Sequence, residues 1–149
     1  MSELAKHLKF DTTKAHANSK AIIKGNNYRI TILSDVLIRF EYNEKGNFCD
    51  YPSFFAINRN FTVPEFNIKQ DTKYLMVENS YFRIDYTKEK PFYGTKVVPD
   101  ANLRVSLKGT DKIWYIGHPE MRNAYGSTYS LDNVEDKVTF DKGLYSTDG

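Results

Sequence analysis

Cysteine is almost absent from this chain of 149 residues, because Cys49 is the only one. No disulfide can form within the chain, and a single thiol cannot complete a structural zinc site. The three histidines, His7, His16 and His118, do not stand at the spacings that metal ligands usually show. We therefore expect no metal site and no cofactor, and we expect the protein to reside in the reducing cytoplasm.

Long apolar runs and an excess of one charge are also missing. No stretch approaches the roughly 20 apolar residues that a membrane helix requires, and residues 1–7 lack the apolar core of a secretory signal. The 21 basic and 19 acidic residues leave a net charge of +2, which is too small for a surface that neutralises phosphates. Neither a membrane nor a nucleic acid is therefore an expected partner.

Aromatic residues, by contrast, are abundant: they make up 15% of the chain, with 11 Tyr and 10 Phe, and they favour half-buried strand positions. Apolar residues alternate with a period of two, and no amphipathic helix of ten residues or more is evident. Turn-forming residues such as Ser34-Asp35 and Asn79-Ser80 separate the alternating stretches. These stretches are 28–33, 36–42, 66–69, 74–78, 81–86, 103–107 and 112–116. The pattern predicts an all-β fold with little or no helix, an antiparallel β-sandwich that contains a 28–42 hairpin.

The length of the chain fits one domain. We expect residues 20–149 to form a single β-sandwich domain, preceded by residues 1–19 as an arm or one helical turn. Two long irregular regions, 50–63 and 87–102, are expected to bridge strands. The chain stops on the apolar, turn-rich stretch 143–149, which predicts further strands or another domain beyond it.

Motifs for catalysis are scarce, since the chain has no glycine-rich phosphate loop and no Gly-x-Ser-x-Gly elbow. Acidic residues gather at Asp132, Glu135, Asp136 and Asp141. Such a group is either a carboxylate pair for acid–base work or a solvated, turn-rich loop. The second interpretation is favoured, because no apolar residues surround the group to shift a pKa.

Two aromatic features have alternative interpretations. The pair Phe54-Phe55 either stacks on a sugar or anchors its loop in a contact between domains, and the anchor is favoured. Trp114, in the stretch 113–116, is either a sugar platform or a core residue. Its apolar neighbours favour the core.

Eight segments occur along the chain in an order that is fairly specific. They are NYRITIL (27–33), LIRFEY (37–42), FCDYPS (48–53), INRNF (57–61), LRVSLKG (103–109), NAYGS (123–127), LDNVE (131–135) and GLYSTDG (143–149). Together they resemble the N-terminal β-sandwich of glycoside hydrolase family 31, over roughly residues 20–149. Tyr125, Ser127 and Thr147 depart from the family pattern, which commonly has glycine, threonine and arginine there.

The resemblance implies a galactose-mutarotase-like supersandwich that precedes a catalytic (β/α)8 barrel. The family hydrolyses α-glycosidic bonds with retention, using two carboxyl groups about 5 Å apart. Both groups belong to the barrel, and its Trp-x-Asp-Met-Asn-Glu-like stretch does not occur here. The chain alone is therefore expected to be noncatalytic, whereas the parent protein is expected to be a family 31 glycoside hydrolase of the α-glucosidase type.

The implied role is that of an accessory domain of an α-glucosidase-like or α-xylosidase-like enzyme. Its partners would be the barrel of the same polypeptide and the oligosaccharide substrate. The alternative is an autonomous carbohydrate-binding module, which needs exposed coplanar aromatic side chains. For the accessory role, the resemblance assigns the substrate-pocket rim to Asp132, Ser146 and Asp148. The barrel-docking surface is assigned to Phe54, Phe55, Leu144 and Tyr145.

Overall fold

The computed structural model describes residues 12–53, 56–93, 102–117, 124–125, 140 and 142–143. The chain divides into two units, one that ends at Gly117 and one that begins at His118. The strands and helices described below belong to the first unit.

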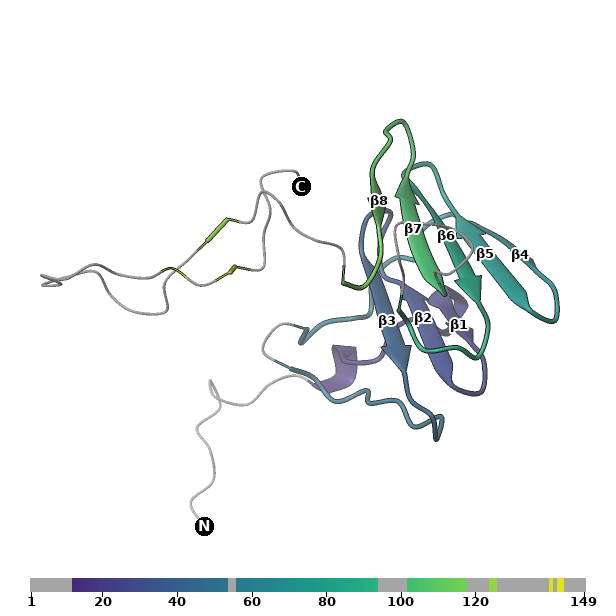
Figure 1. Cartoon of the computed structure of the whole chain (residues 1–149). Coiled ribbons are helices and arrows are strands. Elements are labelled where there is room, and N and C mark those ends of the chain that lie inside the picture. Colours follow the sequence, from purple (N-terminus) through teal and green to yellow (C-terminus); the bar gives the residue numbers. More distant parts are fainter. Residues whose placement is uncertain are drawn as a thin grey trace, which may run out of the picture. The chain divides into compact units, whose positions relative to one another are not determined.

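Within the described residues, eight strands form two antiparallel sheets (Figure 1). The three-stranded sheet has the order β1-β2-β3, with bounds Ile22–Lys24, Tyr28–Ile32 and Ile38–Tyr42. The five-stranded sheet has the order β4-β5-β6-β7-β8, with bounds Asn67–Gln70, Tyr74–Glu78, Phe82–Thr87, Leu103–Leu107 and Ile113–Trp114. Two 3-10 helices, η2 and η3, cover Thr12–Lys14 and Ser19–Ala21. The predicted all-β, antiparallel and helix-poor fold is confirmed.

Each of the seven predicted stretches overlaps a strand, and the hairpin around Ser34-Asp35 joins β2 to β3. Its register pairs Tyr28 with Tyr42 and Ile32 with Ile38. Strand β1 was not predicted, because its three residues are too few to show an alternating pattern. It is defined instead by pairing with β2, which places it at one edge of the sheet.

The two sheets pack face to face through the inner side chains of their strands (Figure 1). Strand β2 supplies Tyr28, Ile30 and Ile32, and all three are almost fully buried. Tyr28 meets Tyr86 of β6 edge to face, with ring centroids 4.9 Å apart. Burial of such side chains contributes about 1.5–3 kcal/mol each. The remaining members of this core are Ile23, Leu75, Val77, Phe82, Ile84, Phe92, Leu103 and Val105.

Trp114 lies at the rim of this core, so the prediction that it is a core residue is wrong. It stands opposite Val105 and on the same face of the sheet, but β8 is a two-residue edge strand and leaves the indole 41% exposed. The indole stacks on Phe40 of β3, with centroids 6.0 Å apart and planes 16° apart. The contact closes the sandwich between its two edge strands, β3 and β8.

Glu89 links a turn of one sheet to a turn of the other. Its carboxylate accepts hydrogen bonds from the backbone N–H groups of Asn26, at 3.0 Å, and Asn27, at 2.8 Å. Those residues form the β1–β2 turn, whereas Glu89 comes after β6. Gly25 packs so closely that a Cβ there would overlap Glu89 and the ring of Tyr28. Glycine is therefore required at this position.

A second polar link joins the sheets through Asn79. Its Nδ2 donates to the carbonyl of Asp35, in the β2–β3 turn, at 2.8 Å. Its Oδ1 accepts from the backbone N–H groups of Tyr81 and Phe82, at 2.8 and 2.9 Å, and so shapes the β5–β6 turn. The side chain is buried, and each of these hydrogen bonds satisfies a group that would otherwise be costly to bury.

Glu89→Ala is expected to lower the free energy of unfolding by about 1–3 kcal/mol, because two backbone donors lose an ionised acceptor. Alanine has a Cβ as glutamate does, so the strain of the positive φ of 61° at this position is unchanged. Urea denaturation measured by tryptophan fluorescence gives the loss. Glu44→Ala, at an exposed turn position, is the matched control. Equal stability of the two variants would show that the Glu89 link contributes nothing.

Candidate functional site

The structure does not place the residues that the sequence assigns to a site. The predicted rim and docking residues all lie outside the described residues: Phe54, Phe55, Asp132, Leu144, Tyr145, Ser146 and Asp148. The acidic group at 132–141 lies outside them as well. These assignments therefore remain predictions.

The described residues contain a different candidate, on the outer face of the three-stranded sheet. Arg29 and Thr31 of β2 point away from the core, yet they are only 6% and 2% exposed. Residues after β3 cover this face, since Arg29 contacts the ring of Phe48 and donates to the carbonyl of Cys49. Strand β2 is thus buried on both faces.

Charged side chains hold this covering segment on the sheet. We define the arginine cluster as Arg29, Arg39, Glu41, Asp50 and Arg59. Arg29 donates hydrogen bonds to Glu41 from Nε and Nη2, and Nη2 lies 2.8 Å from Glu41 Oε1. The same Nη2 lies 2.8 Å from Asp50 Oδ1. Arg39 lies 2.6 Å from Glu41 and donates to the Cys49 carbonyl at 2.8 Å. One buried guanidinium therefore joins two strands to the covering segment.

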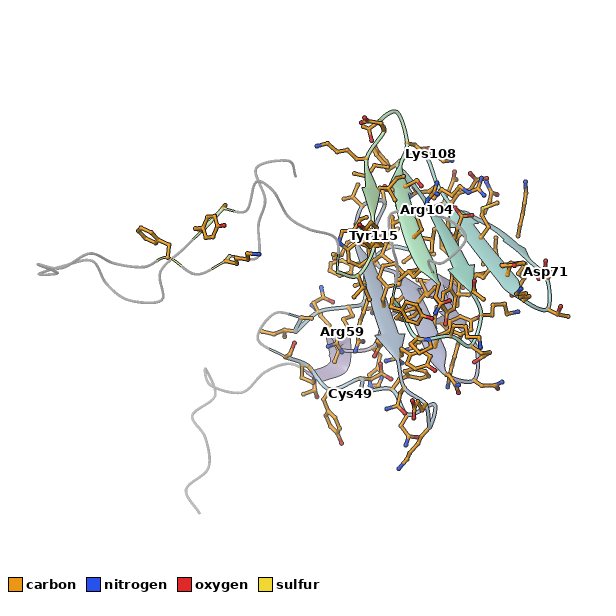
Figure 2. The ribbon with its side chains drawn as sticks, in the orientation of Figure 1. Cys49, Arg59, Asp71, Arg104, Lys108 and Tyr115 are labelled. Atoms are coloured by element: carbon orange, nitrogen blue, oxygen red, sulfur yellow. The ribbon has the colours of Figure 1, made fainter. Side chains whose placement is uncertain are left out.

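Arg59 extends the cluster toward the N-terminal residues. Its backbone N–H donates to Lys14 at 2.7 Å, and its Nη1 donates to the carbonyls of Ala15, at 3.3 Å, and Tyr51, at 3.1 Å. The residue is only 5% exposed, and within the described part of the chain its Nε has no hydrogen-bond partner. Figure 2 shows Arg59 and Cys49 on the same side of the molecule.

The electrostatics of the cluster keep Asp50 ionised. Hydrogen bonds from Arg29 hold the pKa of Asp50 below its usual value. The hydrogen bonds to Glu41 in turn raise the pKa of Arg29. Burial lowers the pKa of Arg39, but an arginine stays protonated at neutral pH. A carboxylate that binds guanidinium groups and resists protonation is poorly suited to be a general acid. The cluster is therefore an electrostatic clamp.

Sequence reasoning missed the cluster, although all five members lie within the segments that resemble the family. One signal was present. The predicted 28–42 hairpin places Arg29 opposite Glu41, and the structure pairs these two residues. Asp50 and Arg59 could not be found this way, because they reach the cluster through irregular backbone.

Comparisons with protein-family models and with curated proteins give no match to this chain. Among the described residues, no three His, Cys, Asp or Glu side chains are grouped to hold a metal ion. The part of the chain that the structure describes also has no helix of the length and apolar character needed to span a membrane.

The clamp makes stability depend on pH through Asp50. Its pKa is lower in the folded chain than in the unfolded one, so its contribution is complete above about pH 5 and declines as the pH falls below about 4. Asp50→Asn should therefore destabilise the protein at neutral pH and much less at about pH 3. Urea denaturation at both values measures this difference.

The control for this experiment is Asp111→Asn, at an exposed turn position between β7 and β8. It should change the free energy of unfolding little at either pH, because Asp111 is exposed and lies in a turn of the five-stranded sheet, whereas Arg29 and Arg39 belong to the three-stranded one. A loss in Asp50→Asn that is the same at both pH values would contradict an ionic role for Asp50.

Proposed function

We propose that this chain is a noncatalytic β-sandwich domain of a cytoplasmic retaining α-glycosidase of glycoside hydrolase family 31. In this role it packs on the catalytic barrel of the same polypeptide and helps to shape the carbohydrate pocket. One observation carries the proposal: four of the segments that resemble the family meet at the arginine cluster.

The convergence of these segments is specific. Segment 27–33 supplies Arg29, segment 37–42 supplies Arg39 and Glu41, segment 48–53 supplies Asp50, and segment 57–61 supplies Arg59. The four segments that resemble the family are thus joined to one another by ion pairs and hydrogen bonds. This connection supports the proposal that they belong to one domain fold.

The clamp also suits a loop that faces a neighbouring domain. Such loops need a fixed position, and binding surfaces are commonly carried on loops that a rigid scaffold holds in place. Ser53 and Ala56 exchange two backbone hydrogen bonds, at 3.4 and 3.0 Å, within the covering segment. The predicted docking pair, Phe54 and Phe55, lies between them in sequence and outside the described residues.

The chemistry of the clamp supports a noncatalytic role. A retaining glycosidase needs a carboxylate nucleophile and a protonated carboxylic acid about 5 Å apart across the scissile bond. Glu41 and Asp50 instead bind the same arginine. Neither carboxylate is free to attack a sugar or to donate a proton to it.

The reading frame beyond codon 149 tests the proposal directly. We expect it to encode a (β/α)8 barrel with a Trp-x-Asp-Met-Asn-Glu-like stretch. Residues 1–149 alone should then release no nitrophenol from p-nitrophenyl α-glucoside or α-xyloside, because the carboxylate pair is in the barrel. Turnover above buffer that survives mutation of the acidic group at 132–141, or a stop codon directly after Gly149, would refute the proposal.

The pocket-rim assignment has its own test in an enzyme that contains this chain. Asp148→Asn is expected to lower kcat/KM by about tenfold, because a carboxylate that accepts hydrogen bonds from sugar hydroxyls contributes about 1–3 kcal/mol. The melting temperature should stay nearly unchanged. Loss of folding with normal kinetics in the folded fraction would instead assign Asp148 to a turn.

A further inference from the structure

A hollow of about 390 Å³ lies on the outer face of the five-stranded sheet, over β4, β5 and β6. Its volume falls within the roughly 300–1,000 Å³ that small-molecule sites occupy. Its lining includes six charged, aromatic or apolar residues whose side chains can contact a ligand: Lys69, Asp71, Tyr74, Met76, Arg83 and Asp85. Figure 2 shows Asp71 at the β4–β5 turn, which bounds the hollow at one end.

The register of the strands brings the central side chains together. Lys69 of β4 pairs with Met76 of β5, and Met76 pairs with Asp85 of β6. The neighbours of Met76 and Asp85 in sequence point into the core and are buried, so these two side chains point outward. The strands therefore form a rigid floor, which is better suited to holding a ligand than a loop is.

The polar part of the floor is the Arg83–Asp85 ion pair, which can both donate and accept hydrogen bonds. Arg83 Nη2 lies 2.7 Å from Asp85 Oδ1, and Arg83 Nε lies 3.0 Å from each Asp85 oxygen. Both side chains remain partly exposed, at 51% and 38%. The outer guanidinium nitrogens and the free lone pairs of the carboxylate thus lie side by side. This arrangement matches two adjacent hydroxyl groups, each of which donates and accepts.

The apolar part of the hollow is formed by Tyr74 and Met76. Tyr74 is 52% exposed, and the Lys73 ammonium lies 5.0 Å from its ring centroid, over one face. Tyr74 thus keeps an exposed surface that a ligand can contact. An aromatic ring beside hydrogen-bonding groups suits a molecule that has both C–H and O–H surfaces.

Charges of both signs line the hollow, with Lys69 and Arg83 positive and Asp71 and Asp85 negative. Lys88, which donates to Gln70 Oε1 and to the Asp71 carbonyl, and Lys73, which lies over the Tyr74 ring, add positive charge beside it. Asp71 accepts hydrogen bonds from the backbone N–H groups of Tyr74 and Lys73, both at 2.7 Å, which lower its pKa and keep it ionised. At the centre of the floor, Arg83 is already paired with Asp85, so a ligand that binds this pair does not need to bring a compensating charge.

We propose that this hollow binds a neutral saccharide, with adjacent hydroxyls on the Arg83–Asp85 pair and an apolar sugar face against Tyr74. The lining supplies one exposed tyrosine and no coplanar aromatic pair, so we expect a Kd on the order of 1 mM. The site lies on the opposite sheet from the arginine cluster. The proposal therefore goes beyond the accessory function and does not depend on it.

NMR titration of the 149-residue chain with maltose tests the proposal. Saturable shifts are expected in the amides of residues 69–76 and 83–85. Tyr74→Ala and Asp85→Asn should each weaken binding at least about fivefold, in line with the loss of one ring contact or one hydrogen-bonding partner. Tyr81→Ala is the matched control, because Tyr81 is 55% exposed and lies outside the hollow. It should leave the affinity unchanged, and the spectrum of each variant verifies its folding.

A parallel titration with glucose 6-phosphate tests the ligand class. We expect it to bind the hollow less tightly than maltose does, because the Arg83 guanidinium is already paired with the Asp85 carboxylate, which repels a phosphate. Three outcomes overturn the proposal: no shifts up to about 20 times the expected Kd, shifts centred elsewhere, or tighter binding of the phosphate. A missing barrel in the reading frame would refute the accessory function but would not affect these results.

Discussion

The bond between Arg29 and its two carboxylates is the interaction on which the covered side of the sandwich depends. A guanidinium in the middle of a strand that is buried on both faces is costly unless its donors are paired. Glu41 pairs with it across the hairpin, and Asp50 does so from the covering segment. The covering segment therefore cannot leave the sheet without exposing a charge that the fold has buried with its partners.

Because of this constraint, the outer faces of the two sheets differ in how far they are covered. The outer face of the three-stranded sheet is covered by the segment that holds Phe48, Cys49 and Asp50, which the arginine cluster keeps in place. The outer face of the five-stranded sheet is open and polar, and its side chains come into direct register across the strands. The same core thus supports two surfaces: a fixed loop, which suits contact with another domain, and an open floor, which suits a small ligand.

Both polar links between the sheets occur in turns, where backbone donors and acceptors lack strand partners. Glu89 serves the β1–β2 turn, and Asn79 serves the β2–β3 and β5–β6 turns. The core between them is apolar and rich in aromatic side chains, so it gives cohesion with little directional preference. The directional hydrogen bonds at the turns add a preference for one alignment of the sheets.

Local patterns in the sequence were enough to predict the fold class, the positions of seven strands and the β2–β3 hairpin, because alternation and turn chemistry are local properties. They did not predict β1, which is too short to show a pattern, or the exposure of Trp114, which follows from its position on a two-residue edge strand. Packing in three dimensions was needed to bring Asp50 to Arg29 and Arg59 to the Tyr51 carbonyl. Strand register was needed to assemble the hollow around Tyr74 and Asp85. Contacts across irregular segments leave no periodic trace in the sequence, since their geometry is set by burial and charge pairing after the strands have packed.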